Sequence, residues 1–204
     1  MTTTPSEIQT DFNQLKREMF DSYPLEGIWS KLELYTLSLS RWSRRINLVS
    51  QRDLSTIATK HIRQALSMVP IVASLPRRVI LDLGSGSGLP AIPLKIALPD
   101  SHFVLVESRR KRAHFLKEVI RSLELSRIEV INDRIESWQG RQDGVDLVTA
   151  RAVATPDKLL DMVRAHLSPH GWVLSPLDRD SAHLVVKRWR IEEGNMGTTL
   201  GLYQ

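Results

Sequence analysis

The amino-acid sequence predicts an α/β protein in which a doubly wound parallel sheet follows an N-terminal cap of helices. Two observations support this prediction. Up to about residue 75 the apolar residues recur only at helical spacing, whereas after Pro76 short strand-like runs alternate with helical segments. Such alternation places helices on both faces of a mostly parallel sheet. We therefore divide the chain into a helical cap, residues 1–75, and a core, residues 76–204.

Length and composition limit the class of protein that this chain can be. The chain has 204 residues, of which 42% are hydrophobic and 25% charged, and its formal net charge is +5. It contains no cysteine, which excludes disulfides and thiolate metal sites and fits a reducing compartment. No apolar run approaches the length of a membrane span, and the polar start is unlike a signal peptide. We expect a cytoplasmic protein without a membrane segment or a metal site.

The sequence predicts three helices in the cap. We expect the first ten residues to be frayed, with amphipathic helices over 12–20 and 27–42. A third helix would be capped by Asp53 and run towards Pro70.

The core reads as alternating strands and helices. We expect strands at 79–83, 103–107, 128–131, 145–150 and 171–175, and helices at 90–98, 109–123 and 156–167. The last 30 residues are ambiguous: 179–189 fits a helix, 183–187 fits a strand, and a turn at 194–199 would precede a strand at 200–203.

A glycine-rich loop follows the first expected strand. The run VILDL, residues 79–83, leads directly into GSGSGLP, residues 84–90. An apolar run that enters glycines is typical of a buried parallel strand ending in a tight loop, and Pro90 suits the first turn of a helix. Glycines let the backbone approach a ligand closely, and the helix N-terminus offers free N–H groups. The stretch therefore predicts a ligand site.

Two strand-end acids and the glycine spacing indicate the ligand. A dinucleotide fingerprint spaces its glycines as G-x-G-x-x-G, but here glycine recurs at 84, 86 and 88, and Asp82 precedes them by two residues. This pattern resembles motif I of the S-adenosylmethionine-dependent methyltransferases, and it implies their class I, Rossmann-like fold. Glu107 ends the next strand, about 20 residues on, where such a sheet places a carboxylate that accepts ribose hydroxyls. The alternative for Glu107 is a solvated loop acid.

Five stretches together resemble one family, the bacterial 16S ribosomal RNA guanine-N7 methyltransferases, also called glucose-inhibited division protein B. They are WSRRINLVS (42–50), HI (61–62), LDLGSGSGLPAIP (81–93), ESRRKRAHFL (107–116) and TARAVA (149–154). The corresponding family segments are W-N-x-x-x-N-L-T, R-H-I-x-D-S, D-V-G-S-G-x-G-[FL]-P-G-I-P, D-S-x-x-K-R-x-x-F-L and [ST]-R-A-[FV]-A. Their order and spacing hold from about residue 40 to residue 174.

The resemblance implies a reaction and its site. The protein would methylate guanine N7 of 16S ribosomal RNA, at guanine 527 in the family, with S-adenosylmethionine as cofactor. Its partner would be the small ribosomal subunit, and we expect a monomer. The cofactor-binding residues implied are Asp82, Gly84, Gly86, Leu89, Glu107, Ile135, Glu136 and Arg151. Arg151 would also act beside the target base as the catalytic residue, and Lys111, Arg112, Arg109, Arg44 and Arg45 would face RNA.

Two segments depart from the family pattern. The acid-serine pair expected after His61-Ile62 is here Gln64-Ala65, and Ser175-Pro176 stands where Lys-Gly usually follows the fifth strand. These changes concern the RNA side more than the cofactor side. They leave open a methyltransferase of the same fold that acts on a small molecule or protein, and a non-catalytic RNA- or ribosome-binding module.

The expected chemistry needs few groups. Guanine N7 carries a lone pair outside the aromatic system, so it attacks a sulfonium methyl without first losing a proton. Arg151 would donate hydrogen bonds to guanine O6 or to a phosphate; the alternative is a structural ion pair with Asp146 or Asp133. Glu136 fits a surface carboxylate as well as a cofactor contact, and His61 fits a packed or capping histidine.

Basic residues occur in three stretches: Arg41, Arg44, Arg45 and Arg52; residues 109–112; and Lys187, Arg188 and Arg190. The middle stretch opens a helix, where positive charge opposes the helix dipole, so an anionic partner explains it better than helix stability does. If the three converge near the cofactor site, they form an RNA-binding rim.

Overall fold

The computed structural model describes residues 3–151, 153–177, 185–193 and 196–204, with the backbone alone for 191–193 and 196–197. The helices are α1 (Pro5–Met19), α2 (Glu26–Ser43), α3 (Gln51–Leu54), α4 (Arg63–Ala73), α5 (Ala91–Ala97), α6 (Arg110–Ser122) and α7 (Pro156–Val163), with a π-helix at Ile57–Ile62. Short 3₁₀ turns lie at Phe20–Ser22, Ile135–Ser137 and Arg164–His166. The strands are β1 (Val79–Leu83), β2 (His102–Val106), β3 (Ile128–Ile131), β4 (Val145–Ala150), β5 (Leu167–Pro176), β6 (Lys187–Glu193) and β7 (Met196–Tyr203).

The strands of the described residues form one sheet with the order β3-β2-β1-β4-β5-β7-β6. Neighbouring strands from β3 to β5 are parallel, and β7 runs antiparallel to both β5 and β6. The order reverses beside β1, and in such sheets ligands bind at the carboxyl ends of the strands at this point. The predicted doubly wound sheet is confirmed.

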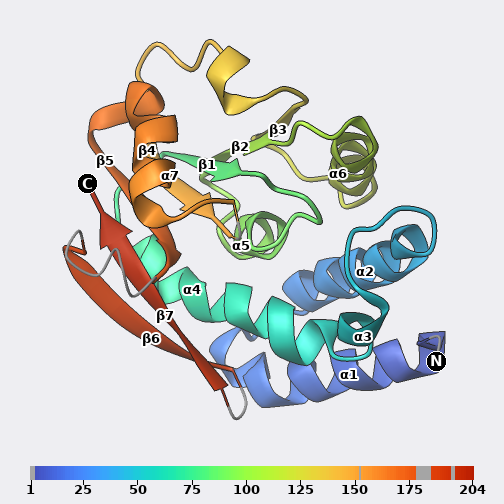
Figure 1. Cartoon of the computed structure of the whole chain (residues 1–204). Coiled ribbons are helices and arrows are strands. Elements are labelled where there is room, and N and C mark those ends of the chain that lie inside the picture. The colour runs from blue at the N-terminus through green and yellow to red at the C-terminus, as the bar shows by residue number, and fades with distance from the viewer. Residues whose placement is uncertain (1–2, 152, 178–184, 194–195) are drawn as a thin grey trace.

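The two faces of the sheet are covered differently. Because side chains alternate along a strand, Ile80 and Phe103 join a core with α1, α2, α4, α5 and α6, whereas Leu81 and Val104 join a second core with α7 and the turn at Ile135. Figure 1 shows α1 to α4 gathered on one side of the sheet, and the β6–β7 hairpin running beside α4. The N-terminal helices share their hydrophobic core with the sheet; the division at residue 75 stays a prediction.

The first ten residues are helical from Pro5 on, so the expectation of a frayed start is wrong. A capping box explains the difference. The Glu7 backbone N–H donates to Thr4 Oγ1 at 3.3 Å, and the Thr4 N–H donates to Glu7 Oε2 at 2.7 Å. These bonds satisfy two donors that a helix start otherwise leaves unpaired.

The third cap helix also differs from the prediction. Its first turn is capped by Ser50, which accepts from the Asp53 N–H at 3.2 Å; Asp53 is therefore not the cap. A π-helix interrupts the segment, and α4 continues through Pro70. Proline lacks the N–H that would bond the carbonyl four residues earlier, and the hydroxyl of Tyr23 donates to that carbonyl, Leu66 O, at 2.7 Å.

The C-terminal region is a β-hairpin. A helix at 179–189 is wrong for residues 187–189, which lie in β6; residues 178–184 lie outside the described residues. The expected turn at 194–199 is also wrong from Met196 on, where β7 begins. The half-buried Trp189 packs on the core beside α4, which explains why this segment pairs as a strand. No helix of the described residues has the length and apolarity to cross a membrane.

Candidate active site

The loop of residues 84–90 turns sharply between β1 and α5. Gly84 has φ +66°, in the left-handed region that favours glycine, and its N–H donates to Val106 O at 2.8 Å. A Cβ on Gly84 would lie 2.7 Å from Val153 Cγ2, and one on Gly88 would lie 2.7 Å from Ile92 Cγ1. Glycine is therefore required at both positions because side chains of this chain pack against them, and the close approach of a ligand to the loop stays a prediction.

Glu107 stands directly after β2 and ties the loop to it. The carboxylate is 4% exposed; its Oε2 accepts from the Gly86 N–H at 2.9 Å, and its Oε1 accepts from the Arg109 N–H at 2.7 Å. Glu107 is therefore not a solvated loop acid. Each carboxylate oxygen has a further lone pair, so the group retains acceptor capacity for a ligand.

Asp82 lies beneath the loop and is 1% exposed. Thr149 Oγ1 on β4 donates to Asp82 Oδ1 at 2.7 Å, whereas Oδ2 is buried without a hydrogen-bond partner among the described residues. Burial raises the pKa of Asp82 to about 6, although the Thr149 hydrogen bond and the charge of Arg151 act to lower it. An incompletely satisfied, buried carboxyl at a strand end is typical of a functional site.

A pocket with an empty volume of about 470 Å³ opens beside the loop. Three of the cofactor-binding residues that the resemblance implies line this pocket: Gly84, Ile135 and Glu136. Ile135 is buried, and Glu136 is exposed at the rim, where it pairs with Arg134 at 3.4 Å. Asp82, Gly86, Glu107 and the buried Leu89 do not line this pocket. Gly86 and Leu89 belong to the loop itself, and Glu107 bonds it from the end of β2.

Arg151 follows β4 and points to the N-terminal helices. Its NH1 lies 3.1 Å from His61 Nδ1 and donates to Gln64 Oε1 at 3.3 Å. The alternative ion pair with Asp146 or Asp133 is wrong, because Asp146 instead accepts from the Val79 N–H and Asp133 from the Arg134 N–H. His61 is thus neither merely packed nor a helix cap.

Two further pockets continue the site along the strand ends. The second has an empty volume of about 840 Å³ and includes Ala150, Thr155 and Pro176; it shares Val153 with the first pocket. The third is narrower, at about 300 Å³; it includes Arg151 and Gln64 and shares Ala150, Ser175 and Pro176 with the second. The departure at Ser175-Pro176 therefore lies inside the candidate site.

Two of the three basic stretches come together. Arg112 NH2 donates to Asn47 O at 2.8 Å, and the rings of Trp42 and His114 pack edge to face with their centroids 5.6 Å apart. The end of α2 therefore adjoins the start of α6. We call Arg44, Arg45, Arg109, Lys111 and Arg112 the basic surface; all but the half-buried Arg112 are exposed. The third stretch does not join it, because Lys187, Arg188 and Arg190 lie on β6, at the opposite edge of the sheet from β3. The condition for a rim of three stretches is therefore not met, and only the first two adjoin each other.

Sequence reasoning missed three contributors to the site. Tyr35 on α2 is fully buried, and its hydroxyl donates to Ser87 O in the glycine loop at 2.8 Å. Thr149 bonds Asp82, and Val153 covers Gly84. The sequence shows Tyr35 only as part of an apolar helix face. No local pattern indicates its partner Ser87, which lies 52 residues away.

The residues present fit S-adenosylmethionine. The first pocket has apolar walls, among them Leu83, Val106 and Met162, and polar groups at its rim, the combination that small-ligand sites use. The unpaired Asp82 Oδ2 supplies negative charge close to the loop, which suits a ligand with a cationic group.

Comparisons with known proteins agree with this geometry. The family described as rRNA small subunit methyltransferase G (GidB) matches residues 28–176. The ribosomal RNA small subunit methyltransferase G of Acidiphilium cryptum is 39% identical over 163 residues, 79% of this chain and 73% of the relative. That of Legionella pneumophila is 36% identical over 151 residues, 74% of this chain and 71% of the relative.

Solved structures share the fold. A methyltransferase from Geobacter sulfurreducens has a TM-score of 0.59 at 14% identity and covers 83% of this chain and 87% of its own. An S-adenosylmethionine-dependent methyltransferase from Aquifex aeolicus has a TM-score of 0.54 at 14% identity, with coverages of 74% and 93%. The fold is that of class I methyltransferases, and by the match over residues 28–176 the chain belongs to the rRNA small subunit methyltransferase G family.

Proposed function

We propose that this protein transfers a methyl group from S-adenosylmethionine to N7 of a guanine in 16S ribosomal RNA. The observation that carries the proposal is spatial: in a chain of this family, the glycine loop, two strand-end carboxyls and Arg151 all lie at the carboxyl ends of the neighbouring strands β2, β1 and β4. The finer assignment is guanine 527, and we propose that the enzyme acts as a monomer on the small subunit in the cytoplasm.

Each site residue has a proposed role toward the cofactor. S-adenosylmethionine supplies an electrophilic methyl group on a sulfonium sulfur. Gly84 and Leu89 shape the space beside it, Glu107 accepts the ribose hydroxyls, and Ile135 and Glu136 flank the adenine. Asp82 places its carboxyl beneath the loop, where ionised oxygen favours a cation.

The transfer itself requires orientation more than proton transfer. Guanine N7 attacks with its lone pair, and the base gains a methyl group and a positive charge without losing a proton. The protein must therefore hold N7 in line with the methyl–sulfur bond, which breaks with its electron pair returning to sulfur. Such positioning alone supplies a large share of a rate enhancement. We assign the target base to the second pocket, beside Ala150. Arg151 lines the adjoining third pocket, and we propose that its remaining donors bond guanine O6 or a phosphate.

The basic surface serves the rest of the substrate. Arg44, Arg45, Arg109, Lys111 and Arg112 adjoin the glycine loop through Arg112, whose NH1 lies 3.6 Å from the position of a Cβ on Gly86. Cations that contact phosphates release counterions, so binding to RNA should weaken steeply with salt.

Transfer of a labelled methyl group to small subunits that lack the modification tests the proposal. We expect label in 16S RNA at one guanine, mapped by strand cleavage at N7-methylguanine, and none in subunits already modified. Label at another guanine would reject the finer assignment alone, and no transfer despite cofactor binding would reject the function.

A different acceptor is the second candidate, because both departures from the family pattern contribute to the pockets beside Arg151: Gln64 lines the third pocket, and Ser175 and Pro176 line the second and third. A small molecule or protein would then be methylated, with little dependence on salt if that acceptor is neutral.

A further inference from the structure

Arg151 is held by two uncharged acceptors from outside the sheet. His61 is the fifth residue of the π-helix and Gln64 lies in the first turn of α4, and both meet the same guanidinium nitrogen, NH1. Because NH1 of arginine only donates, His61 Nδ1 must accept, and the imidazole carries its proton on Nε2. Burial, and next the charge of Arg151, lower the pKa of His61 to about 4, so the imidazole is neutral near pH 7.

The contact leaves most of the guanidinium available. Nε and NH2 of Arg151 have no hydrogen-bond partner within the part of the chain that the structure describes, and no carboxylate there pairs with it. The residue is half-buried and lines the third pocket together with Thr149 and Ser175. Arg151 is therefore fixed at one nitrogen while it retains its full charge and its other donors.

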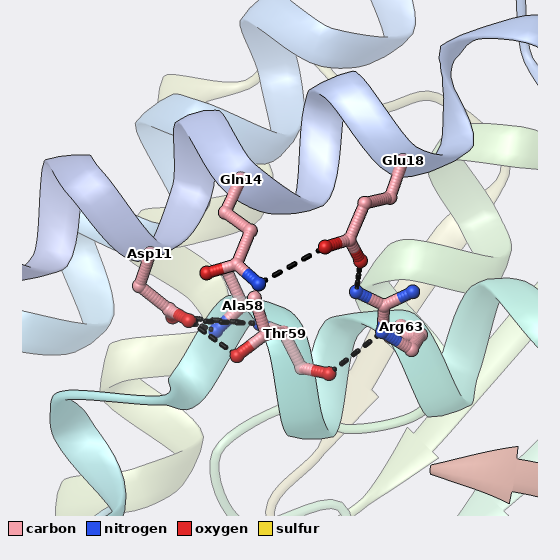
Figure 2. Close-up of polar contacts among 6 residues, drawn as sticks. All are labelled: Asp11, Gln14, Glu18, Ala58, Thr59 and Arg63. Carbon is pink, nitrogen blue, oxygen red and sulfur yellow. Dashed lines mark hydrogen bonds and ion pairs between the residues drawn. The ribbon is translucent and has the colours of Figure 1, made fainter. Parts of the chain in front are cut away.

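The π-helix that carries His61 is itself fixed by α1. Asp11, 7% exposed, accepts from the Ala58 N–H at 2.7 Å and the Thr59 N–H at 3.2 Å, and Thr59 Oγ1 also donates to it. One turn on, Arg63 pairs with Glu18 of α1 and donates from Nε to Thr59 O at 2.9 Å (Figure 2). Thr59 and Arg63 lie on the side that faces α1, and His61 and Gln64 lie on the side that faces Arg151.

We infer that His61 and Gln64 are positioning residues for Arg151, and that α1 fixes them through Asp11 and Glu18 even though it lies outside the residues matched by the family. The inference rests on the proposed function for the role of Arg151. π-helices occur frequently at functional sites, and here the wide turn is the segment that brings His61 to the guanidinium. Neutral acceptors orient the group without cancelling the charge that an RNA acceptor would meet.

Kinetics of single variants give the first test. We expect Gln64→Ala and His61→Ala each to lower kcat/KM for RNA about tenfold or more, with the dissociation constant of S-adenosylmethionine unchanged by calorimetry. His61→Asn, which restores an acceptor near the Nδ1 position, should recover part of the loss. Gln9→Ala and His102→Ala are matched controls: both side chains are half-buried and hydrogen-bonded, to Glu33 and Glu129 respectively, away from the site. Equal losses in the controls would overturn the inference.

A double-mutant cycle separates positioning from structural effects. If Gln64 acts through Arg151, Gln64→Ala should add no further loss in an Arg151→Ala background. A loss of the same size in both backgrounds would overturn the inference. Gln64→Glu retains the acceptor but pairs the guanidinium with a carboxylate, so we expect weaker RNA binding and a salt dependence reduced by about one phosphate contact.

A spectroscopic arm does not depend on methylation. Long-range proton–nitrogen correlation of the imidazole should show His61 with its proton on Nε2, and Arg151→Ala should shift the Nδ1 resonance, while Arg164→Ala should not. A proton on Nδ1 would overturn the inference. If wild-type protein transferred no methyl group to RNA but gave the expected spectra, the proposed function would fail and the Arg151 contact would stand.

Discussion

Replacing Asp82 by asparagine tests whether the carboxyl beneath the glycine loop reduces the stability of the protein. The folded chain raises the pKa of Asp82 from 3.8 to about 6, chiefly through burial. Between these values the folded state binds the proton more tightly than the unfolded state. The carboxylic acid therefore stabilises the fold below about pH 4, and this contribution is lost as the pH rises through about 6.

The size of the effect follows from that difference in pKa. At about 1.4 kcal/mol for each pH unit, a rise from 3.8 to about 6 corresponds to about 3 kcal/mol, of which about 1.5 kcal/mol is lost between pH values of about 5 and 7.5. The amide of the Asp82→Asn variant does not titrate, and its carbonyl retains the acceptor that Thr149 uses. A constant cost of the amide cancels when two pH values are compared.

Urea unfolding of both proteins at the two pH values measures the change. We expect Asp82→Asn to gain about 1.5 kcal/mol relative to wild type on going from about pH 5 to 7.5, and to bind S-adenosylmethionine at least about tenfold more weakly at the higher value. A difference in unfolding free energy that stays flat, with a carbon-13 titration of the Asp82 carboxyl near pH 4, would refute the reasoning.

Three further predictions concern the loop and the basic surface. Glu107→Ala removes the acceptor of two backbone N–H groups, so we expect a loss of about 3 kcal/mol in urea unfolding and at least about tenfold weaker cofactor binding by calorimetry; unchanged affinity would remove the ribose role. Gly84→Ala should destabilise by about 1–3 kcal/mol, because φ is positive and the new Cβ meets Val153. In the Gly84→Ala variant, the second substitution Val153→Ala should restore only the part of the unfolding free energy that is lost to the clash. Full restoration would contradict the prediction, because it would show that the positive φ at residue 84 does not destabilise alanine. Lys111→Ala should lower the salt slope of RNA binding by about one, measured by anisotropy, whereas Arg164→Ala, at an exposed position just after α7, should leave it unchanged.

The sequence allowed the sheet to be predicted because its signals are local. The central strands β1, β2 and β4 consist largely of buried apolar residues, and the glycine loop marks the end of β1 within a residue. The start of α1 was also readable, since Thr4 and Glu7 have capping-box spacing with Pro5 between them. The expectation of a frayed start was wrong because this local capping signal was overlooked.

The irregular parts of the cap depend on distant partners. Asp11, 47 residues from Ala58, accepts from backbone N–H groups of the π-helix. The carbonyl of Leu66, which Pro70 leaves without its helical donor, accepts from the hydroxyl of Tyr23, 43 residues away. Local reading ends a helix at such a proline. Only the tertiary structure shows that a replacement donor is present.

The same limit applies to the candidate site. Asp82, Gly84 and Glu107 were recognisable because they end adjacent strands, whose carboxyl ends meet at one edge. The partners of Arg151 were not, because the nearby acids Asp133 and Asp146 seemed the natural counterions, whereas the observed partners lie 90 and 87 residues away. A neutral partner for an arginine carries no charge pattern in the sequence.

A reaction that needs no general base places its demands on orientation. The groups that fix orientation here come from outside the sheet: Tyr35 of α2 bonds the glycine loop, and His61 and Gln64 bond Arg151. Both contacts depend on N-terminal helices whose own packing is shared with the sheet core. Loosening α1 should therefore slow methyl transfer before it prevents cofactor binding, because Glu107 and Gly86 remain bonded to each other and Tyr35 of α2 still bonds the glycine loop.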